Sequence, residues 1–290
     1  MKILITGTNG FLGIRALRYL SCQNACLAPD HQNFDLTNVE MCRDFIEEKQ
    51  PDVVLHLAAI SEIPECEKNP ELSKKVNLDG PINLAQICKE KGIRFIFASS
   101  DQVYTGSKTT EAGTEKDDCH PTNVYAQHKY LAEQQILSIL PDAIGLRFSW
   151  MYDLPDRKLK VKSNFSVNLL NSLIQQKPQY FSDQCLRSVT YSRFVIENIV
   201  KIIDLSNFPG GIYNFGSPAN GNFFEFCQEA YRVAGEFKKM PWENLCLKAE
   251  EKSFENLSMD QTKLNQNGIY FPDPLEGFEL CFRDHDDKRR

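Results

Sequence analysis

The sequence lacks the features that mark membrane, secreted and nucleic-acid-binding proteins. It has no apolar run near the ~18 residues that a membrane span needs, and it begins directly with a short strand-like stretch in place of a signal peptide. It has no basic stripe, and its net charge is −6. We therefore predict a cytoplasmic protein with neither a membrane nor a nucleic acid as partner.

The ten cysteines lack a metal-binding pattern. No Cys-x-x-Cys occurs, Cys22 and Cys26 are the only close pair, and Cys119-His120 has no further ligand near it in the sequence. In a cytoplasmic protein, scattered cysteines are typically reduced thiols. The sequence accordingly predicts no metal site.

Strand and helix signals alternate in the first half of the 290 residues. Apolar strand-like runs at 2–6, 52–59, 94–99 and 142–150 are separated by stretches with helical periodicity at 14–20, 71–91 and 125–140. This alternation predicts an α/β fold of the Rossmann type, a doubly wound parallel sheet with helices on both faces. Ligands of such sheets bind beyond the carboxyl ends of the strands.

Three glycines follow the first strand. Gly7, Gly10 and Gly13 lie in Thr-Gly-Thr-Asn-Gly-Phe-Leu-Gly, where the first would make the tight turn, the second admit a pyrophosphate and the third let helix and strand pack closely. The turn predicts a dinucleotide site, with the cofactor contacts Gly7, Thr8, Asn9, Gly10, Phe11 and Leu12.

The residue at the end of the second strand would decide between NAD and NADP. An acid at the end of the second strand would bind the ribose 2′-hydroxyl and repel a 2′-phosphate. None occurs before Asp30, and Arg15 lies near the phosphate helix, which leans weakly toward NADP. Asp30 could still serve NAD, so both cofactors stay open.

The second half is less regular, and we predict two domains. Residues 1–153 form the NAD(P)-binding Rossmann domain, and 154–290 form mainly a smaller C-terminal substrate-binding lobe, with segments around 186–216 returning to the Rossmann sheet.

Tyr-x-x-x-Lys occurs twice. Tyr104…Lys108 contains Gly106, a helix breaker, whereas Tyr125…Lys129 opens a long helical pattern in which positions i and i+4 share a face. A phenol has a pKa near 10, and an ammonium group one turn away would lower it and could also bind the nicotinamide ribose. We predict Tyr125 and Lys129 as catalytic and cofactor-binding residues.

The Gly-x-x-Gly-x-x-Gly spacing resembles that of extended short-chain dehydrogenases/reductases. Ser99–Tyr104, Pro121–Tyr125, Leu146–Tyr152 and Asp260–Leu264 resemble segments of the dTDP-4-dehydrorhamnose reductase family. The resemblance places Ser100 at the catalytic serine/threonine position. It also implies cofactor contacts at Asp35, Leu36, Leu57, Ala58 and Ala59.

Gln102 and the segment 252–260 narrow the range of reactions and substrates that the sequence allows. Gln102 stands where sugar-nucleotide dehydratases have a carboxylate, which argues against elimination chemistry. The segment 252–260 lacks the Arg-Pro with which that family helps to hold its nucleotide sugar, so the deoxythymidine-sugar substrate is in doubt while the reductase core is not.

The sequence therefore predicts an NAD(P)H-dependent oxidoreductase that reduces a keto group on a nucleotide-activated sugar. Two alternatives stay open: an NAD-dependent sugar-nucleotide epimerase, and a non-catalytic NADP-binding regulatory subunit of the kind that accompanies methionine adenosyltransferase, which resembles the same family. A homodimer is compatible with the sequence.

Overall fold

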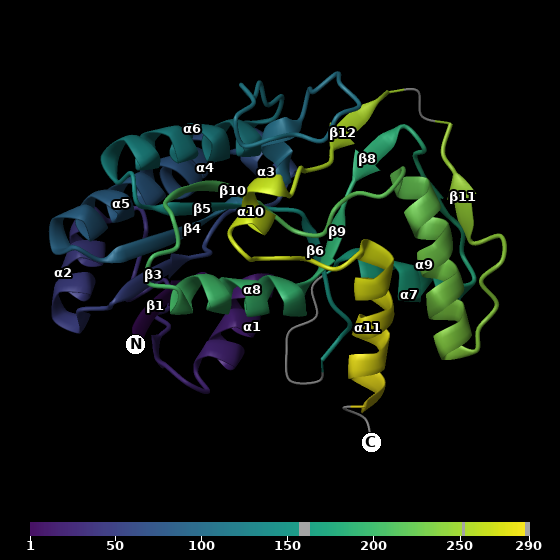
Figure 1. The fold of residues 1–290 in the computed structure, drawn as a ribbon, viewed down its shortest axis with the longest axis horizontal. Helices are drawn as coiled ribbons and strands as arrows, with labels where there is room; N and C mark the ends of the chain where they lie inside the picture. Colours follow the sequence, from purple (N-terminus) through teal and green to yellow (C-terminus); the bar gives the residue numbers. More distant parts are fainter. Residues whose placement is uncertain (157–162, 251–252, 288–290) are drawn as a thin grey trace. The chain divides into compact units, whose positions relative to one another are not determined.

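A computed structural model describes residues 1–156, 163–250 and 253–287 (Figure 1). They form two compact units, and each is described by itself. Unit 1 comprises residues 1–105, 118–148 and 196–213; unit 2 comprises 106–117, 149–195 and the residues from 214 onward. The division into domains at 1–153 and 154–290 remains a prediction. The compact units have other bounds, because unit 1 includes residues 196–213 and unit 2 includes residues 106–117.

A central sheet organises unit 1. Its strand order is β10-β5-β4-β3-β1-β2 in the described residues, and the pairs from β2 to β5 are parallel. Since β1 and β3 are neighbours and β2 lies on the far side of β1, the order reverses beside β1, which is where such folds bind ligands. The strands are β1 (Lys2–Thr6), β2 (Ala25–Leu27), β3 (Val53–His56), β4 (Arg94–Ser100), β5 (Ile144–Phe148) and β10 (Gly211–Phe215).

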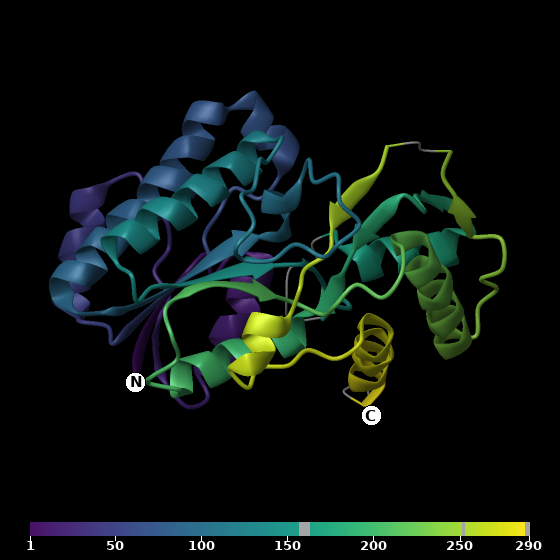
Figure 2. The ribbon, with the colours of Figure 1, turned by 45° about the horizontal axis from the view of Figure 1, so that its top comes forward.

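Helices cover both faces of this sheet, which confirms the predicted doubly wound α/β fold. Figures 1 and 2 show α2, α5 and α6 on one face and α1 with the later part of α8 on the other. Every residue of β3 is buried, as expected for a strand covered on both sides. The helices are α1 (Phe11–Leu20), α2 (Val39–Lys49), α5 (Gly80–Lys91), α6 (Val124–Ile139) and α8 (Ser192–Asp204).

The helical stretch predicted at 71–91 is interrupted where Gly80-Pro81 suggested. It consists of α4 (Pro70–Lys74), a π-helical turn η1 (Lys75–Asp79) and then α5. Because proline lacks an N–H and its ring clashes with the preceding turn, a regular α-helix cannot pass through this point. The short helix α3 (Ile63–Lys68) precedes this stretch.

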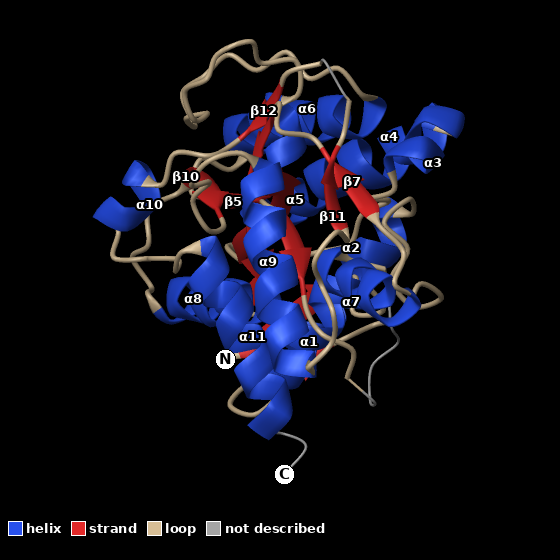
Figure 3. Ribbon diagram, turned by 90° about the vertical axis from the view of Figure 1, so that its right-hand side faces the viewer, coloured by secondary structure: helices blue, strands red, loops and turns tan. Residues whose placement is uncertain are grey.

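Unit 2 combines helices with short strand pairs (Figure 3). Its pairs are β6 with β9, β8 with β12 and β7 with β11. The helices enclose an aromatic core in which Phe165 contacts both Phe223 and Phe278, with ring centroids 5.8 Å apart in each pair. The elements are β6 (Trp150–Tyr152), α7 (Phe165–Gln175), β7 (Gln179–Phe181), β8 (Cys185–Arg187), β9 (Val189–Tyr191), α9 (Phe223–Lys238), β11 (Cys246–Lys248), β12 (Glu255–Leu257), α10 (Thr262–Gln266) and α11 (Pro274–Asp287).

Two expectations from composition concern the whole chain. Across the part that the structure describes, no helix is both long and apolar enough to cross a membrane. All ten cysteines lie in this part, and none forms a disulfide.

Candidate active site

The glycine turn lies between β1 and α1. Gly7 has a φ of 73°, and a Cβ there would lie 2.7 Å from the backbone N and Cα of Ala58. A Cβ on Gly13 would lie 2.1 Å from the carbonyl oxygen of Gly7, so the helix packs against the turn as the spacing predicts. No side chain caps α1, whose first N–H groups are therefore available to an anion.

A cavity of about 190 Å³ opens beside this turn within unit 1. Seven predicted cofactor contacts line it, namely Gly7, Thr8, Asn9, Asp35, Leu36, Ala58 and Ala59. The other predicted contacts, Gly10, Phe11, Leu12, Leu57, Tyr125 and Lys129, are not among its lining residues. Five lining residues were not predicted as contacts, namely Thr6, Pro29, His31, Phe34 and Val76.

The acids near the end of β2 are already engaged in local hydrogen bonds. Asp30 accepts from the main-chain N and the side-chain Nδ2 of Asn33 at 3.0 and 2.7 Å and does not line the cavity. Asp35 accepts from both the N–H and the hydroxyl of Thr37 at 2.9 and 2.8 Å. Burial acts to raise the pKa of Asp35, but the bonds from Thr37 and the nearby His31 leave it lowered, so the carboxylate is charged at neutral pH.

The predicted catalytic hydroxyls meet at the carboxyl edge of the sheet. Ser100 is the last residue of β4, and Tyr125 lies in the first turn of α6, which Asn123 caps by accepting from the N–H of Ala126 at 2.8 Å. The Ser100 hydroxyl donates to Oδ1 of Asp101 at 3.1 Å, and it interacts with the Tyr125 phenol so as to lower the pKa of that group. Ser100 also accepts from the N–H of Gln102 at 3.2 Å, which holds its side chain in place.

Burial dominates the electrostatics of Tyr125. It raises the pKa of the phenol above the ordinary value, and nearby Asp101 adds to the effect, while the interaction with Ser100 opposes it. The sequence predicts that Lys129 lowers this pKa. In this structure the Lys129 ammonium lies 6.0 Å from the centroid of the Tyr125 ring and donates to the carbonyl of Ala98 at 3.0 Å.

Lys129 is itself buried. Burial lowers its pKa to about 8, although the carboxylate of Glu133 one turn further along α6 opposes the shift. Lys129 is therefore still largely protonated at pH 7, but its charge lies in a desolvated place where it interacts strongly with neighbouring groups.

The competing tyrosine has a different environment. Tyr104 ends a 3₁₀ turn, η2 (Asp101–Tyr104), and its buried hydroxyl accepts from Nη1 of Arg147 at 2.7 Å. No α-helix joins Tyr104 to Lys108, so the i and i+4 relation that the chemistry needs is absent between these two described residues. The selection of Tyr125 on helical context matches these facts.

A buried ion pair lies between α6 and β5, and the sequence analysis did not predict it. The Arg147 guanidinium donates to both carboxylate oxygens of Glu133, from Nε at 3.0 and 3.2 Å and from Nη2 at 2.7 Å, and both side chains are only 2% exposed. The hydroxyl of Ser99 donates to the same carboxylate. The pair joins α6 to β5, and Ser99 adds β4, so it positions the elements that bear Ser100, Tyr125 and Lys129.

A second buried group connects the glycine turn to the neighbouring strand. The Thr6 hydroxyl lies 2.8 Å from Nδ1 of His56 and accepts from the N–H groups of Leu57 and Ala58, both at 3.2 Å. Burial, reinforced by the charge of Lys129, lowers the pKa of His56 to about 3. His56 is therefore a neutral structural imidazole at physiological pH.

The segment without Arg-Pro belongs to unit 2. Lys252 lies outside the described residues, and Glu255–Leu257 form β12. Asn256 donates to the carbonyls of Thr109 and Glu111 at 2.8 and 2.7 Å, so this side chain organises the loop. Residues 253–260 include no cation that could replace the missing arginine.

Comparison with known proteins identifies the family of this chain. The RmlD substrate binding domain family matches residues 1–270. The chain belongs to this family. Its membership confirms the predicted relation to sugar-nucleotide reductases of the extended short-chain type.

Individual relatives agree with this assignment. A dTDP-4-dehydrorhamnose reductase of Streptomyces griseus is 33% identical over 242 residues, which are 80% of this chain and 76% of that protein. A probable low-salt glycan biosynthesis reductase of Haloferax volcanii is 34% identical over 164 residues, about half of either chain (52% and 54%).

Solved structures confirm the fold. The crystal structure of a dTDP-4-dehydrorhamnose reductase of Bacillus anthracis, in complex with NADP, superposes with a TM-score of 0.85. It covers 98% of both chains at 23% identity, a level at which the likeness concerns the fold.

Proposed function

We propose that this protein is an NAD(P)H-dependent reductase of a keto group on a nucleotide-activated sugar. The observation that carries the proposal is the placement of Ser100 at the carboxyl end of β4, where it interacts with Tyr125 in the first turn of α6, with Lys129 one turn further along the same helix. The glycine turn and its cavity belong to the same compact unit.

The cofactor site fits a dinucleotide. The absence of a side chain at Gly7 and Gly13 keeps the turn close to Ala58 and to α1, and the uncapped helix start would receive the pyrophosphate. A bound NAD(P)H supplies the hydride for the reduction. Lys129 would hold it by donating to the ribose hydroxyls, as the family resemblance implies.

The protonation state of Tyr125 favours reduction. A carbonyl that accepts hydride becomes an alkoxide and needs a proton. Tyr125 is a protonated phenol because burial raises its pKa, and it can donate that proton. The Ser100 hydroxyl would donate a hydrogen bond to the same oxygen and hold it beside Tyr125.

We further propose that NADP is preferred. The carboxylate of Asp30, which would repel a 2′-phosphate, turns toward Asn33 and does not line the cavity. His31 and Asp35 both line it, with Nδ1 of His31 3.8 Å from Oδ2 of Asp35, so an imidazolium at His31 would offset the charge of that carboxylate beside a 2′-phosphate. The proposed order of affinity is NADPH above NADH, and fluorescence titration with each cofactor measures it.

The decisive experiment follows NADPH and NADH oxidation against a panel of 4-keto nucleotide sugars that differ in base and in sugar. Wild type should consume NADPH with at least one member, and Tyr125→Phe should bind NADPH without consuming it. Tightly held NAD with no net consumption would instead indicate an epimerase. Cofactor binding without turnover, in a protein that co-purifies with a larger catalytic subunit, would indicate a regulatory role.

A further inference from the structure

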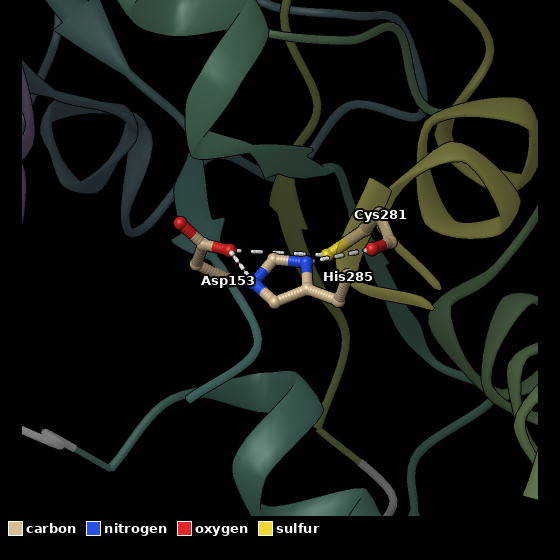
Figure 4. A group of neighbouring side chains, drawn as sticks. All are labelled: Asp153, Cys281 and His285. Atoms are coloured by element: carbon tan, nitrogen blue, oxygen red, sulfur yellow. Dashed lines mark hydrogen bonds and ion pairs between the residues drawn. The ribbon is translucent and has the colours of Figure 1, made fainter. Parts of the chain in front are cut away.

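Three potential metal ligands from distant parts of the sequence meet in unit 2 (Figure 4). Asp153 follows β6, and Cys281 and His285 lie one turn apart on α11. The His285 Nε2 atom is 3.4 Å from Oδ1 of Asp153, and the Cys281 sulfur is 4.0 Å from the same oxygen. All three ligand atoms lie within 4.8 Å of one another.

The two separations from the Asp153 oxygen are close to those around a tetrahedral zinc ion. Zinc bonds of about 2.0 to 2.3 Å place ligand atoms roughly 3.3 to 3.8 Å apart. The two distances to the Asp153 oxygen require shifts of a few tenths of an ångström at most from that range. Thiolate, imidazole and carboxylate together favour zinc over calcium or magnesium, which prefer oxygen ligands.

The tautomer of His285 directs a lone pair into the cluster. Its Nδ1 lies 2.8 Å from the carbonyl oxygen of Cys281, and a carbonyl can only accept, so Nδ1 carries a hydrogen. In the neutral ring, Nε2 then presents its lone pair to the Asp153 carboxylate. Two acceptors that face each other need a proton or a cation between them.

Asp153 and His285 also have supporting hydrogen bonds of the kind that orients metal ligands. The second oxygen of Asp153, Oδ2, accepts from the hydroxyl of Ser192 at 2.8 Å. The carbonyl of Cys281 orients the His285 ring. The Cys281 sulfur donates as a thiol to Oδ1 of Asp153 at 4.0 Å, and burial together with the charge of Asp153 raises its pKa well above the ordinary value, so a zinc ion has to displace the thiol proton.

We propose that Asp153, Cys281 and His285 bind one zinc ion and leave its fourth position to water or another ligand. On binding, the ion takes the place of the thiol proton, which goes to solvent, and no electron is transferred. The site would tie α11 to the segment after β6. It does not depend on the proposed reductase activity.

The spacing of the ligands explains why the sequence predicts no metal site. Asp153 and Cys281 are 128 residues apart, and only the packing of α11 in unit 2 brings them together. The competing interpretation is an ion pair between a protonated His285 and Asp153, with a neutral thiol beside it.

Cobalt binding to the full-length chain distinguishes the two. After treatment with a chelator and its removal, titration with Co²⁺ should give the near-ultraviolet absorption band of a thiolate–cobalt bond, saturating at one ion per chain, and Zn²⁺ should abolish it. Cys281→Ser should lack this band. Cys227→Ser, which changes another fully buried cysteine of unit 2, should keep it. No thiolate band in wild type, or an undiminished band in Cys281→Ser, overturns the proposal.

A second set of variants covers the case in which Cys281→Ser does not fold. His285→Gln leaves the buried thiol in place and should weaken zinc binding more than tenfold, measured by competition with a chromophoric chelator. Ser192→Ala removes only the bond to Asp153, and a loss of about tenfold is expected. His120→Gln, which changes an exposed imidazole, should bind zinc as wild type does. Wild-type affinity in His285→Gln would contradict the proposal.

Discussion

Unit 1 holds the glycine turn with Tyr125 and Lys129, and unit 2 holds the cluster of Asp153, Cys281 and His285. Both are proposed functional sites, but the sequence assembles them differently. In unit 1, short-range rules bring the groups together: three glycines in seven residues, and a tyrosine and lysine one helical turn apart. In unit 2, Cys281 and His285 share a helix turn, but Asp153 comes from 128 residues away. Sequence therefore predicts the first site and misses the second.

Removing the proton donor tests the unit 1 site most directly. Tyr125→Phe deletes only the phenol hydroxyl, and turnover should fall about 10²- to 10⁴-fold, the usual contribution of a general acid. NADPH affinity, measured by fluorescence titration, should change little.

Tyr104→Phe is the matched variant, because this tyrosine belongs to the other Tyr-x-x-x-Lys pattern. It loses a hydrogen bond from Arg147, so a modest loss of stability is expected with turnover per folded molecule retained. Equal losses of turnover in the two variants would contradict the choice of Tyr125.

The buried ion pair beneath α6 should be the most sensitive electrostatic contact in unit 1. Glu133→Gln leaves the Arg147 charge buried without its counter-charge, and the free energy of unfolding should fall by about 3–5 kcal/mol. Urea denaturation followed by circular dichroism measures this change.

Glu229→Gln provides the surface comparison in unit 2. Its partner Arg232 is 36% exposed and also pairs with Glu236, so the change should be below about 1 kcal/mol. If both variants lost the same free energy, burial would not be what makes the Glu133 pair important.

A single methyl group added to the glycine turn should weaken cofactor binding. Gly7→Ala places a Cβ 2.7 Å from the backbone of Ala58 and forces an alanine to a φ of 73°, which costs about 1–2 kcal/mol from the backbone alone. NADPH affinity should fall at least tenfold. Gly92→Ala, where φ is 64° but a Cβ meets nothing within 4 Å, separates the steric clash from the backbone strain. Unchanged affinity in Gly7→Ala would contradict the turn as the cofactor site.

His56 gives unit 1 a pH dependence. Its pKa is about 3 in the folded chain against about 6.5 when unfolded, so between these values the unfolded state binds the extra proton. The stability contributed by the neutral imidazole is fully present above pH 6.5 and is lost as pH falls, by about 1.4 kcal/mol per pH unit. Denaturation at pH 7, 6 and 5 measures the slope.

His56→Gln should flatten that slope, even if the variant is less stable at pH 7. His120→Gln should leave it unchanged, because this imidazole is exposed. A wild-type slope in His56→Gln would show that other groups cause the acid sensitivity.

Sequence reasoning succeeded where one element determines the geometry. Tyr125 and Lys129 share a helix turn, the turn gives Gly7 a φ of 73°, and Gly13 is required by its close approach to the carbonyl of Gly7. It missed contacts between elements, such as Glu133 with Arg147 and Thr6 with His56, because no local pattern indicates which strands will be neighbours.

The sequence by itself determined the strand–helix alternation, the glycine turn and the helix that carries Tyr125 and Lys129, because these depend on backbone geometry and on spacings of a few residues. The tertiary structure decided what surrounds each group. Burial keeps Tyr125 protonated, the turn at Asn33 takes Asp30 away from the cavity, and the packing of α11 brings His285 and Cys281 to Asp153. Desolvation and long-range contacts exist only once the chain has folded, since both depend on which distant residues become neighbours.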